Sequence, residues 1–290
     1  MTRNWKQVNN KYRNEGYLYL SFGFIESWKS EMKDLNYRKR GGQFKYPNSL
    51  IQYCSVLKAV FGIGFRQIDG FTKALIQWLP ISESPDYTTI SRRFNKLGLD
   101  LISSLKNIDE GQIIAIDSTG IKLFQSGEWI REKHNKRKPF LKLHVAVNVK
   151  TKQATAQIMT EDSVGDINMS NELVKQAQKS ASVIKVLEDG AYDSYQNYID
   201  AKRLGFELIV KPRKGSIGNG LNDRAKTVRR IRAIGEENWK KEVQYGRRWL
   251  VEIWYSVFKR RFGEHCFCRK PENIEQELLF KTILCNQMIA

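Results

Sequence analysis

Hydrophobic and polar residues alternate most regularly in the middle of the chain. Every second residue from Leu141 to Val149 is Leu or Val, which predicts a strand with one buried face. A shorter apolar run at residues 112–117 ends in Asp117, and residues 154–160 follow a turn at 150–153. These patterns predict three strands, of which the second and third form an antiparallel hairpin.

Helical and strand patterns alternate after this hairpin. We expect helices at residues 166–179 and 194–203 and strands at 183–187 and 207–211, with a long helix around 247–262. Three antiparallel strands followed by alternating helix and strand form a mixed sheet with helices available for both faces. This is the element order of an α/β protein with a ribonuclease H-like fold.

The first hundred residues predict helices, which we expect at 47–61, 64–79 and 86–94. The last two are compatible with a helix-turn-helix. That unit would place Arg92 and Arg93 on the early turns of its later helix, where they can reach phosphates or base edges. An ordinary three-helix packing unit with a solvated basic face is the alternative.

The change of pattern divides the chain into two expected domains. Residues 1–108 would form an N-terminal helical, helix-turn-helix-like domain, and residues 109–290 the ribonuclease H-like domain. A chain of 290 residues with 41% hydrophobic content is long enough to bury such cores, which excludes a disordered chain or a short peptide.

The net charge indicates the partner more than the fold. Lys and Arg number 49 against 31 Asp and Glu, which gives a net charge of +18. Such a surplus favours a polyanion, and double-stranded DNA is the expected partner. Between residues 202 and 261 there are 17 Lys and Arg against 6 Asp and Glu, and a second basic run extends from Arg131 to Lys142. We expect both to follow the DNA, with Lys142 contacting it.

The four cysteines, at positions 54, 266, 268 and 285, do not form a disulfide framework. The sequence begins without a charged cap and apolar run, and the apolar stretch at 17–25 stops at Glu26, short of a membrane span. We therefore expect a reduced, cytoplasmic and nucleoid-associated protein with no membrane partner.

Two acids follow predicted strands. Asp117 ends the first strand and Asp189 closely follows the fourth, and these strands are neighbours in a ribonuclease H-like sheet. Two carboxylates ~4 Å apart repel by about 4 kcal/mol at an effective dielectric constant of 20, and a divalent cation would relieve this repulsion. Taken singly, each aspartate could equally be a turn residue at a strand end.

A third acid lies on the long C-terminal helical pattern. At about 100° per residue, Tyr245, Arg248, Glu252 and Lys259 share one narrow polar stripe, and most of the remaining circumference is apolar. A glutamate on a packed helix needs a cation, either a metal or an arginine. A local pair between Arg248 and Glu252 is the simpler alternative.

Three carboxylates from separate elements suit Mg²⁺ or Mn²⁺, which bind oxygen ligands and phosphates. Two such ions could activate a water or a 3′-hydroxyl and stabilise the departing oxygen at phosphorus. The expected chemistry is therefore metal-dependent phosphodiester cleavage and strand transfer.

At these residues the sequence resembles the DDE transposases of bacterial and archaeal insertion sequences, specifically the insertion-sequence-five group within the insertion-sequence-four superfamily. The superfamily signature of Tyr, two residues, Arg, three residues, Glu, six residues and Lys fits at Tyr245, Arg248, Glu252 and Lys259 without a gap. Further matching pieces begin at Pro85, Ile116, Lys142 and Asp189.

The resemblance implies a DDE triad of Asp117, Asp189 and Glu252 that holds the metal ions in a catalytic domain at 109–290. It also implies that the tyrosine, arginine and lysine of the signature contact DNA phosphates. Asp193 rivals Asp189 for the second position, but it directly precedes a helix and has an ordinary N-cap explanation.

The expected function is that of a transposase. It would bind the terminal inverted repeats of its element, cleave the ends and join the 3′-hydroxyls to target DNA, as a homodimer or larger assembly because two ends must meet. A ribonuclease H-like nuclease without strand transfer, or a transposase remnant that binds DNA but has lost catalysis, are the alternatives.

Overall fold

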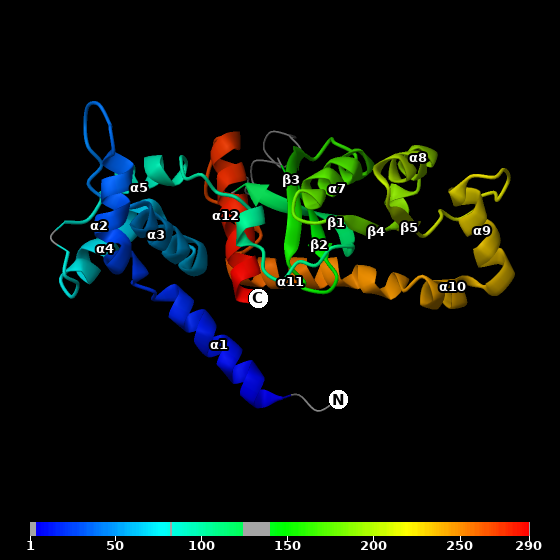
Figure 1. Cartoon of the computed structure of the whole chain (residues 1–290), viewed down its shortest axis with the longest axis horizontal. Helices are drawn as coiled ribbons and strands as arrows, with labels where there is room; N and C mark the ends of the chain where they lie inside the picture. Colours follow the sequence, from blue (N-terminus) through cyan, green and yellow to red (C-terminus); the bar gives the residue numbers. More distant parts are fainter. Residues whose placement is uncertain (1–3, 82, 124–139, 290) are drawn as a thin grey trace, which may run out of the picture. The chain divides into compact units, whose positions relative to one another are not determined.

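A computed structural model describes residues 4–81, 83–123 and 140–289. The chain divides into two units, Met1–Leu99 and Asp100–Ala290. Each unit has its own architecture (Figure 1). Among the described residues, no helix is long and apolar enough to cross a membrane.

The first unit is helical, which confirms the predicted N-terminal helical region. Its core includes Cys54, Leu57, Ile68 and Ile90, all fully buried. The carboxylate of Asp86 caps the last helix by accepting a hydrogen bond from the Thr89 N–H. The helices are α1 (Trp5–Tyr19), α2 (Gly23–Asn36), α3 (Asn48–Phe61), α4 (Phe65–Ile76) and α5 (Tyr87–Phe94).

The second unit is built on a mixed sheet with the strand order β3-β2-β1-β4-β5. β2 pairs antiparallel with β1 and β3, whereas β4 and β5 continue the sheet in parallel, and a short β6 pairs with the far end of β1. This topology confirms the ribonuclease H-like fold. The strands are β1 (Gln112–Leu123), β2 (Phe140–Asn148), β3 (Ala154–Glu161), β4 (Val183–Glu188), β5 (Glu207–Val210) and β6 (His265–Cys266).

Helices cover both faces of this sheet. α7 and α8 lie on one face and α11 on the other (Figure 1), and α12 packs against α11 and β3. These helices are α7 (Ser170–Gln178), α8 (Tyr195–Leu204), α9 (Asp223–Ile234), α10 (Glu236–Glu242), α11 (Trp249–Phe262) and α12 (Pro271–Ile289), with 3₁₀ turns η1 (Ile102–Ser104), η2 (Asp166–Met169), η3 (Gly190–Tyr192) and η4 (Tyr245–Arg248).

Strand alternation decides which side chains meet which helix. Ile114 and Ile116 of β1 join the core under α7 and α8. Asp117 has the opposite parity and therefore faces α11. The face that receives Asp117 is thus the face covered by the helix that carries Glu252.

Two differences from the sequence prediction affect the site. β1 does not end at Asp117 but runs on to Leu123, because Ser118, Thr119 and Gly120 pair with β2 although they interrupt the apolar pattern. The basic stretch between the last predicted strand and the long helix, for which the sequence pattern predicted no element, contains two helices, α9 and α10.

A buried ion pair within α12 makes hydrogen bonds to the backbone around β6. Glu277 and Lys281 lie 2.8 Å apart, with side chains 3% and 2% exposed. Glu277 also accepts the backbone N–H groups of Phe267 and Cys268, and Lys281 donates to the His265 carbonyl.

We expect Lys281→Met to lower the free energy of unfolding by about 3–5 kcal/mol, because the change leaves the Glu277 carboxylate buried without its cation. Urea unfolding of the full chain measures this loss. Lys226→Met is the control, since the exposed Lys226–Asp223 pair should contribute about 1 kcal/mol or less. Equal losses in the two variants would contradict the prediction.

Candidate active site

The sheet register places the first two acids side by side. Ala115 of β1 pairs with Leu187 of β4, and their pairing ends there. Asp117 and Asp189 each lie two residues further along, so both project to the α11 face from strands about 4.8 Å apart. The predicted convergence of these two elements therefore follows from one parallel register.

Asp117 sits in partly buried surroundings, with its side chain 23% exposed. Its carboxylate accepts the Ser118 N–H at 2.8 Å. Burial raises the pKa of Asp117 to about 6, against the lowering effect of the Ser118 N–H and Arg248, and the negative charges of Asp189 and Glu252 raise it further. Both of the other predicted acids thus act on Asp117.

Asp189 caps the turn η3 by accepting the Ala191 N–H at 2.8 Å. This contact fixes the start of the loop that follows β4. It leaves the second carboxylate oxygen for another partner.

Glu252 lies in the first turn of α11, where the helix dipole favours a negative charge. The Arg248 guanidinium donates to it at 2.5 Å and lies 3.9 Å from Asp117. The local Arg248–Glu252 pair considered above is therefore present, and the same guanidinium reaches an acid on β1. Arg248 links two of the three acids as an internal cation.

The prediction that one continuous helix carries all four residues of the polar stripe is wrong for Tyr245 and Arg248. Tyr245–Arg248 form the 3₁₀ turn η4, and α11 begins only at Trp249. Gln244, which precedes this turn, has a left-handed backbone conformation (φ 57°) that separates it from α10. Tyr245 is consequently directed to β4, where its hydroxyl donates to the Glu188 carbonyl at 2.9 Å.

The acid residues fit a divalent metal by their chemistry, because carboxylate oxygens are the donors that Mg²⁺ and Mn²⁺ prefer. Asp117 and Asp189 would hold such an ion from adjacent strands, and Glu252 would join them from α11. Within the described part of the chain, no three His, Cys, Asp or Glu side chains are already grouped tightly enough to enclose an ion. Glu252 is instead turned to Arg248.

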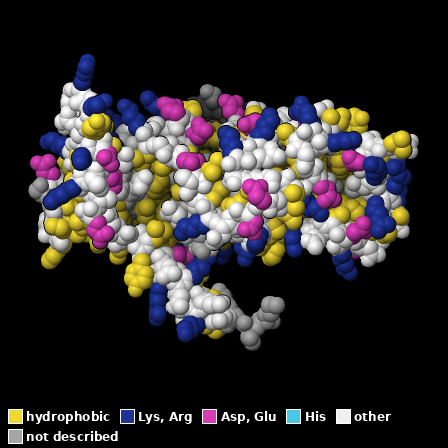
Figure 2. All heavy atoms as spheres, in the orientation of Figure 1, with side chains coloured by type: hydrophobic (Ala, Val, Ile, Leu, Met, Phe, Trp, Pro, Cys, Tyr) yellow, Lys and Arg dark blue, Asp and Glu magenta, His cyan; other side chains and the backbone are white. Residues whose placement is uncertain are grey.

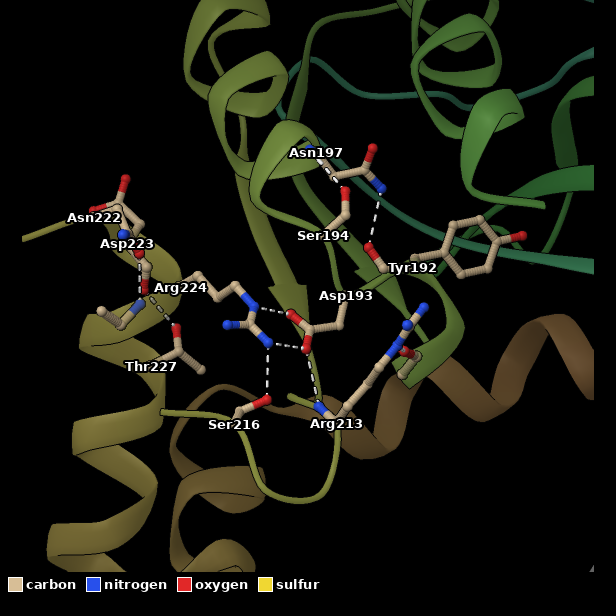
Figure 3. Close-up of polar contacts among 12 residues, drawn as sticks. Tyr192, Asp193, Ser194, Asn197, Arg213, Ser216, Asn222, Asp223, Arg224 and Thr227 are labelled. Carbon is tan, nitrogen blue, oxygen red and sulfur yellow. Dashed lines mark hydrogen bonds and ion pairs between the residues drawn. The ribbon is translucent and has the colours of Figure 1, made fainter. Parts of the chain in front are cut away.

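Asp193, the rival second acid, is fully occupied elsewhere (Figure 3). Its buried carboxylate accepts two hydrogen bonds of 2.7 Å from Arg224 of α9 and one of 2.9 Å from the Arg213 N–H. Burial alone would raise the pKa of Asp193, but these donors hold it below 3.8. The N-cap explanation is wrong, because Ser194 caps α8.

The side chains predicted to contact DNA differ in whether they already bind other groups of the protein. Arg92 is exposed, and Lys259 has a loose pair with Glu264 at 3.9 Å. Arg93 donates to Asn48 and to the Tyr46 carbonyl. Lys142 pairs with Asp166 at 3.2 Å and donates to the Val164 carbonyl.

The basic surface over α9 is visible as a gathering of Lys and Arg side chains (Figure 2). Several of these cations have partners within the protein: Arg224 with Asp193, Arg230 with Glu242, and Arg229 with loop carbonyls. Part of the charge density predicted to follow DNA therefore stabilises the fold. Most of the other basic run, from Arg131 to Lys142, falls outside the described residues.

Sequence reasoning missed buried polar groups next to the acids. Glu188 is fully buried, accepts the Ser170 hydroxyl, and has a pKa raised to about 8 by burial. His144 is also buried, although it lies between the Leu and Val positions of the alternating pattern, and it contacts the Thr160 hydroxyl at 2.8 Å. Tyr255 donates to backbone carbonyls of β1 and β2. Only its spacing of three residues from Glu252 could have suggested its position.

Comparison with known families identifies this arrangement. A family model described as the transposase DDE domain matches residues 109–287, more than half of the chain, and a second model of the same description matches residues 11–126. The chain belongs to the DDE transposase family. The family implies an enzyme that cleaves and transfers DNA, and DDE transposases typically use divalent metal ions.

Two solved transposase structures show low similarity to the chain. The piggyBac transposase synaptic complex with hairpin DNA has 10% sequence identity and a TM-score of 0.47, and the match covers 94% of this chain and 73% of that one. The Drosophila P element transposase strand transfer complex has 12% identity and a TM-score of 0.35, with 89% and 69% covered.

We expect Asp117→Asn to stabilise the metal-free protein near neutral pH. The folded-state pKa of Asp117, about 6, lies above its usual 3.8, so the native state binds the proton more tightly than the unfolded chain does. The wild type therefore loses stability as pH rises from about 4 to 6, and the full cost of about 2–3 kcal/mol is present above pH 6.

Urea unfolding in a chelator at pH 4 and pH 7.5 measures this effect. Asp117→Asn should exceed the wild type by about 2–3 kcal/mol more at pH 7.5 than at pH 4. An identical difference at both pH values would show that Asp117 titrates normally.

Replacing the two rival aspartates should separate stability from catalysis. Asp193→Asn removes the charge that pairs with Arg224 and should lower the free energy of unfolding by about 3 kcal/mol while cleavage persists at low temperature. Asp189→Asn should abolish cleavage and leave stability within about 1 kcal/mol, because an amide can still accept the Ala191 N–H. The opposite pattern would identify Asp193 as the second acid.

Proposed function

We propose that this protein is a metal-dependent transposase that binds the terminal inverted repeats of its insertion sequence, cleaves DNA at the ends and joins the 3′-hydroxyls to target DNA. The observation that supports this most is the in-register placement of Asp117 and Asp189 on the sheet face that α11 covers with Glu252. Burial is the main cause that raises the pKa of Asp117 to about 6, and the charges of Asp189 and Glu252 add to it.

Asp117, Asp189 and Glu252 would hold the ions, and we infer two Mg²⁺ or Mn²⁺. When bound, such ions activate the attacking oxygen and stabilise the leaving oxygen in an in-line displacement at phosphorus. The chain's own contribution is to position the DNA and to supply negative charge from a half-buried place, where it attracts cations strongly.

Arg248 would exchange partners during DNA binding. Its guanidinium neutralises Glu252 and Asp117 in the metal-free protein. It can turn to a DNA phosphate without leaving two bare carboxylates only when another cation neutralises them. Metal and DNA are therefore expected to strengthen each other's binding, as reciprocal linkage requires.

Lys259 and the exposed Arg92 would contact the phosphate backbone together with Arg248. Arg93 and Lys142 could do so only by exchanging the protein partners described above. Cleavage at both ends of an element requires two ends to meet, so we infer a homodimer or larger assembly on double-stranded DNA, in the cytoplasm at the nucleoid.

We also infer membership of the insertion-sequence-five group within the insertion-sequence-four superfamily of bacterial and archaeal elements. The ungapped match at Tyr245, Arg248, Glu252 and Lys259 supports this finer assignment.

The test is incubation of the full chain with end DNA, a supercoiled plasmid and Mn²⁺. We expect products joined to the plasmid, and a rate reduced at least about 1,000-fold in Glu252→Gln while end binding is largely kept. Glu237→Gln, which alters an exposed carboxylate of α10, is the matched control and should cleave normally.

Other outcomes would separate the alternatives. Cleavage without joined products would indicate a nuclease of the same fold. DNA binding without cleavage in the wild type, unchanged in Glu252→Gln, would indicate a transposase remnant and overturn the proposal.

A further inference from the structure

Two tyrosines flank Glu252 on one continuous stretch of chain. Tyr245 lies seven residues before it in η4, and Tyr255 lies three residues after it in α11. The hydroxyl of each donates to the backbone of a strand that carries another of the acids. The stretch that supplies the third acid is thereby tied to the first and to the second.

Tyr255 connects α11 to the strand of Asp117. Its buried hydroxyl donates to the Asp117 carbonyl at 2.7 Å and to the Leu143 carbonyl at 2.9 Å, so it reaches both β1 and β2. Burial raises the pKa of Tyr255 well above its usual 10, and the phenol remains a neutral donor at any working pH. One hydroxyl therefore fixes how far Glu252 stands from Asp117.

Tyr245 makes the corresponding connection to β4. Its hydroxyl donates to the carbonyl of Glu188, the residue directly before Asp189, at 2.9 Å. The ring packs against Trp239 of α10 at 5.5 Å between centroids. Burial also raises the pKa of Tyr245. This side chain is half-buried, and its hydroxyl is directed to the backbone of β4.

The hydrogen bonds that the acids themselves make do not set the distances between the elements that carry them. Asp117 and Asp189 accept backbone N–H groups one and two residues further along the chain, and Glu252 contacts Arg248 one turn away. These contacts are local in sequence, and the like charges repel. Sheet pairing fixes the strands of Asp117 and Asp189, so bonds from other residues are needed to fix the stretch that carries Glu252.

We propose that Tyr245 and Tyr255 are positioning residues that set where Glu252 stands relative to Asp117 and Asp189. The inference rests on the proposed function, because it takes Asp117, Asp189 and Glu252 as the metal ligands. Residues that orient metal ligands from behind typically affect metal affinity about 10- to 100-fold.

The test uses the full chain with Tyr245→Phe or Tyr255→Phe, which remove only the hydroxyl and keep the ring packed. Mn²⁺ binding is titrated by electron paramagnetic resonance, without DNA and with end DNA. Each variant should weaken Mn²⁺ binding about tenfold or more in both conditions. Cleavage should recover towards the wild-type rate at saturating Mn²⁺, while affinity for end DNA in a chelator stays unchanged.

Tyr53→Phe is the matched control, since Tyr53 is buried in the helical unit and its hydroxyl has no hydrogen-bond partner among the described residues. It should leave Mn²⁺ binding unchanged. A thermal unfolding midpoint for each variant shows whether the protein is folded during the titration. If either Tyr245→Phe or Tyr255→Phe fails to fold, the Mn²⁺ titration of the other variant tests the proposal.

Two results would contradict the proposal in different ways. If the Phe variants bind Mn²⁺ as the wild type does, the positioning role is overturned, and weaker DNA binding in Tyr245→Phe would then indicate a phosphate contact. If the wild type binds no Mn²⁺ with or without DNA, and Asp117→Asn behaves identically, the proposed function fails and the positioning role fails with it.

Discussion

The negative charge that Asp189 and Glu252 exert on the partly buried Asp117 is the constraint on which the arrangement of the second unit depends. Sheet register and helix packing force these groups together in partly buried surroundings, and Arg248 is the cation that offsets their charge in the metal-free protein. Its guanidinium is 20% exposed, so its interaction with the acids is only partly screened by water. A site that needs a cation to be stable is already suited to bind one.

The fold was largely predictable because its evidence is periodic. Alternation in β2 and the order of strands and helices were enough to predict the ribonuclease H-like sheet. β1 beyond Asp117 was not predictable in this way, because its polar residues belong to the strand only through pairing with β2. Likewise α9 and α10 carry so many charges that their pattern resembles a linker.

The neighbouring strands of Asp117 and Asp189 were predictable, but the surroundings of the two acids were not. The apolar runs before Asp117 and Asp189 predicted that the two acids belong to neighbouring strands, and a fixed signature located Glu252 in the sequence. Hydrogen bonds from Tyr255 to a carbonyl, or from Arg224 to Asp193, join residues more than 30 positions apart and leave no periodic trace. Asp193 shows the difficulty, since both its N-cap role and its candidacy as a metal ligand were reasonable from sequence alone.

The Arg224–Asp193 ion pair has a consequence for how such proteins can diversify. It anchors the beginning of α9 to the loop after β4, so the chain between β5 and α11 is held at a point close to where it leaves the sheet. Lengthening a loop behind a fixed anchor is inexpensive, about 0.6 kcal/mol for each doubling. Whole modules could therefore be accommodated beyond α9 during evolution, or grafted there by engineering, without disturbing Asp117, Asp189 and Glu252.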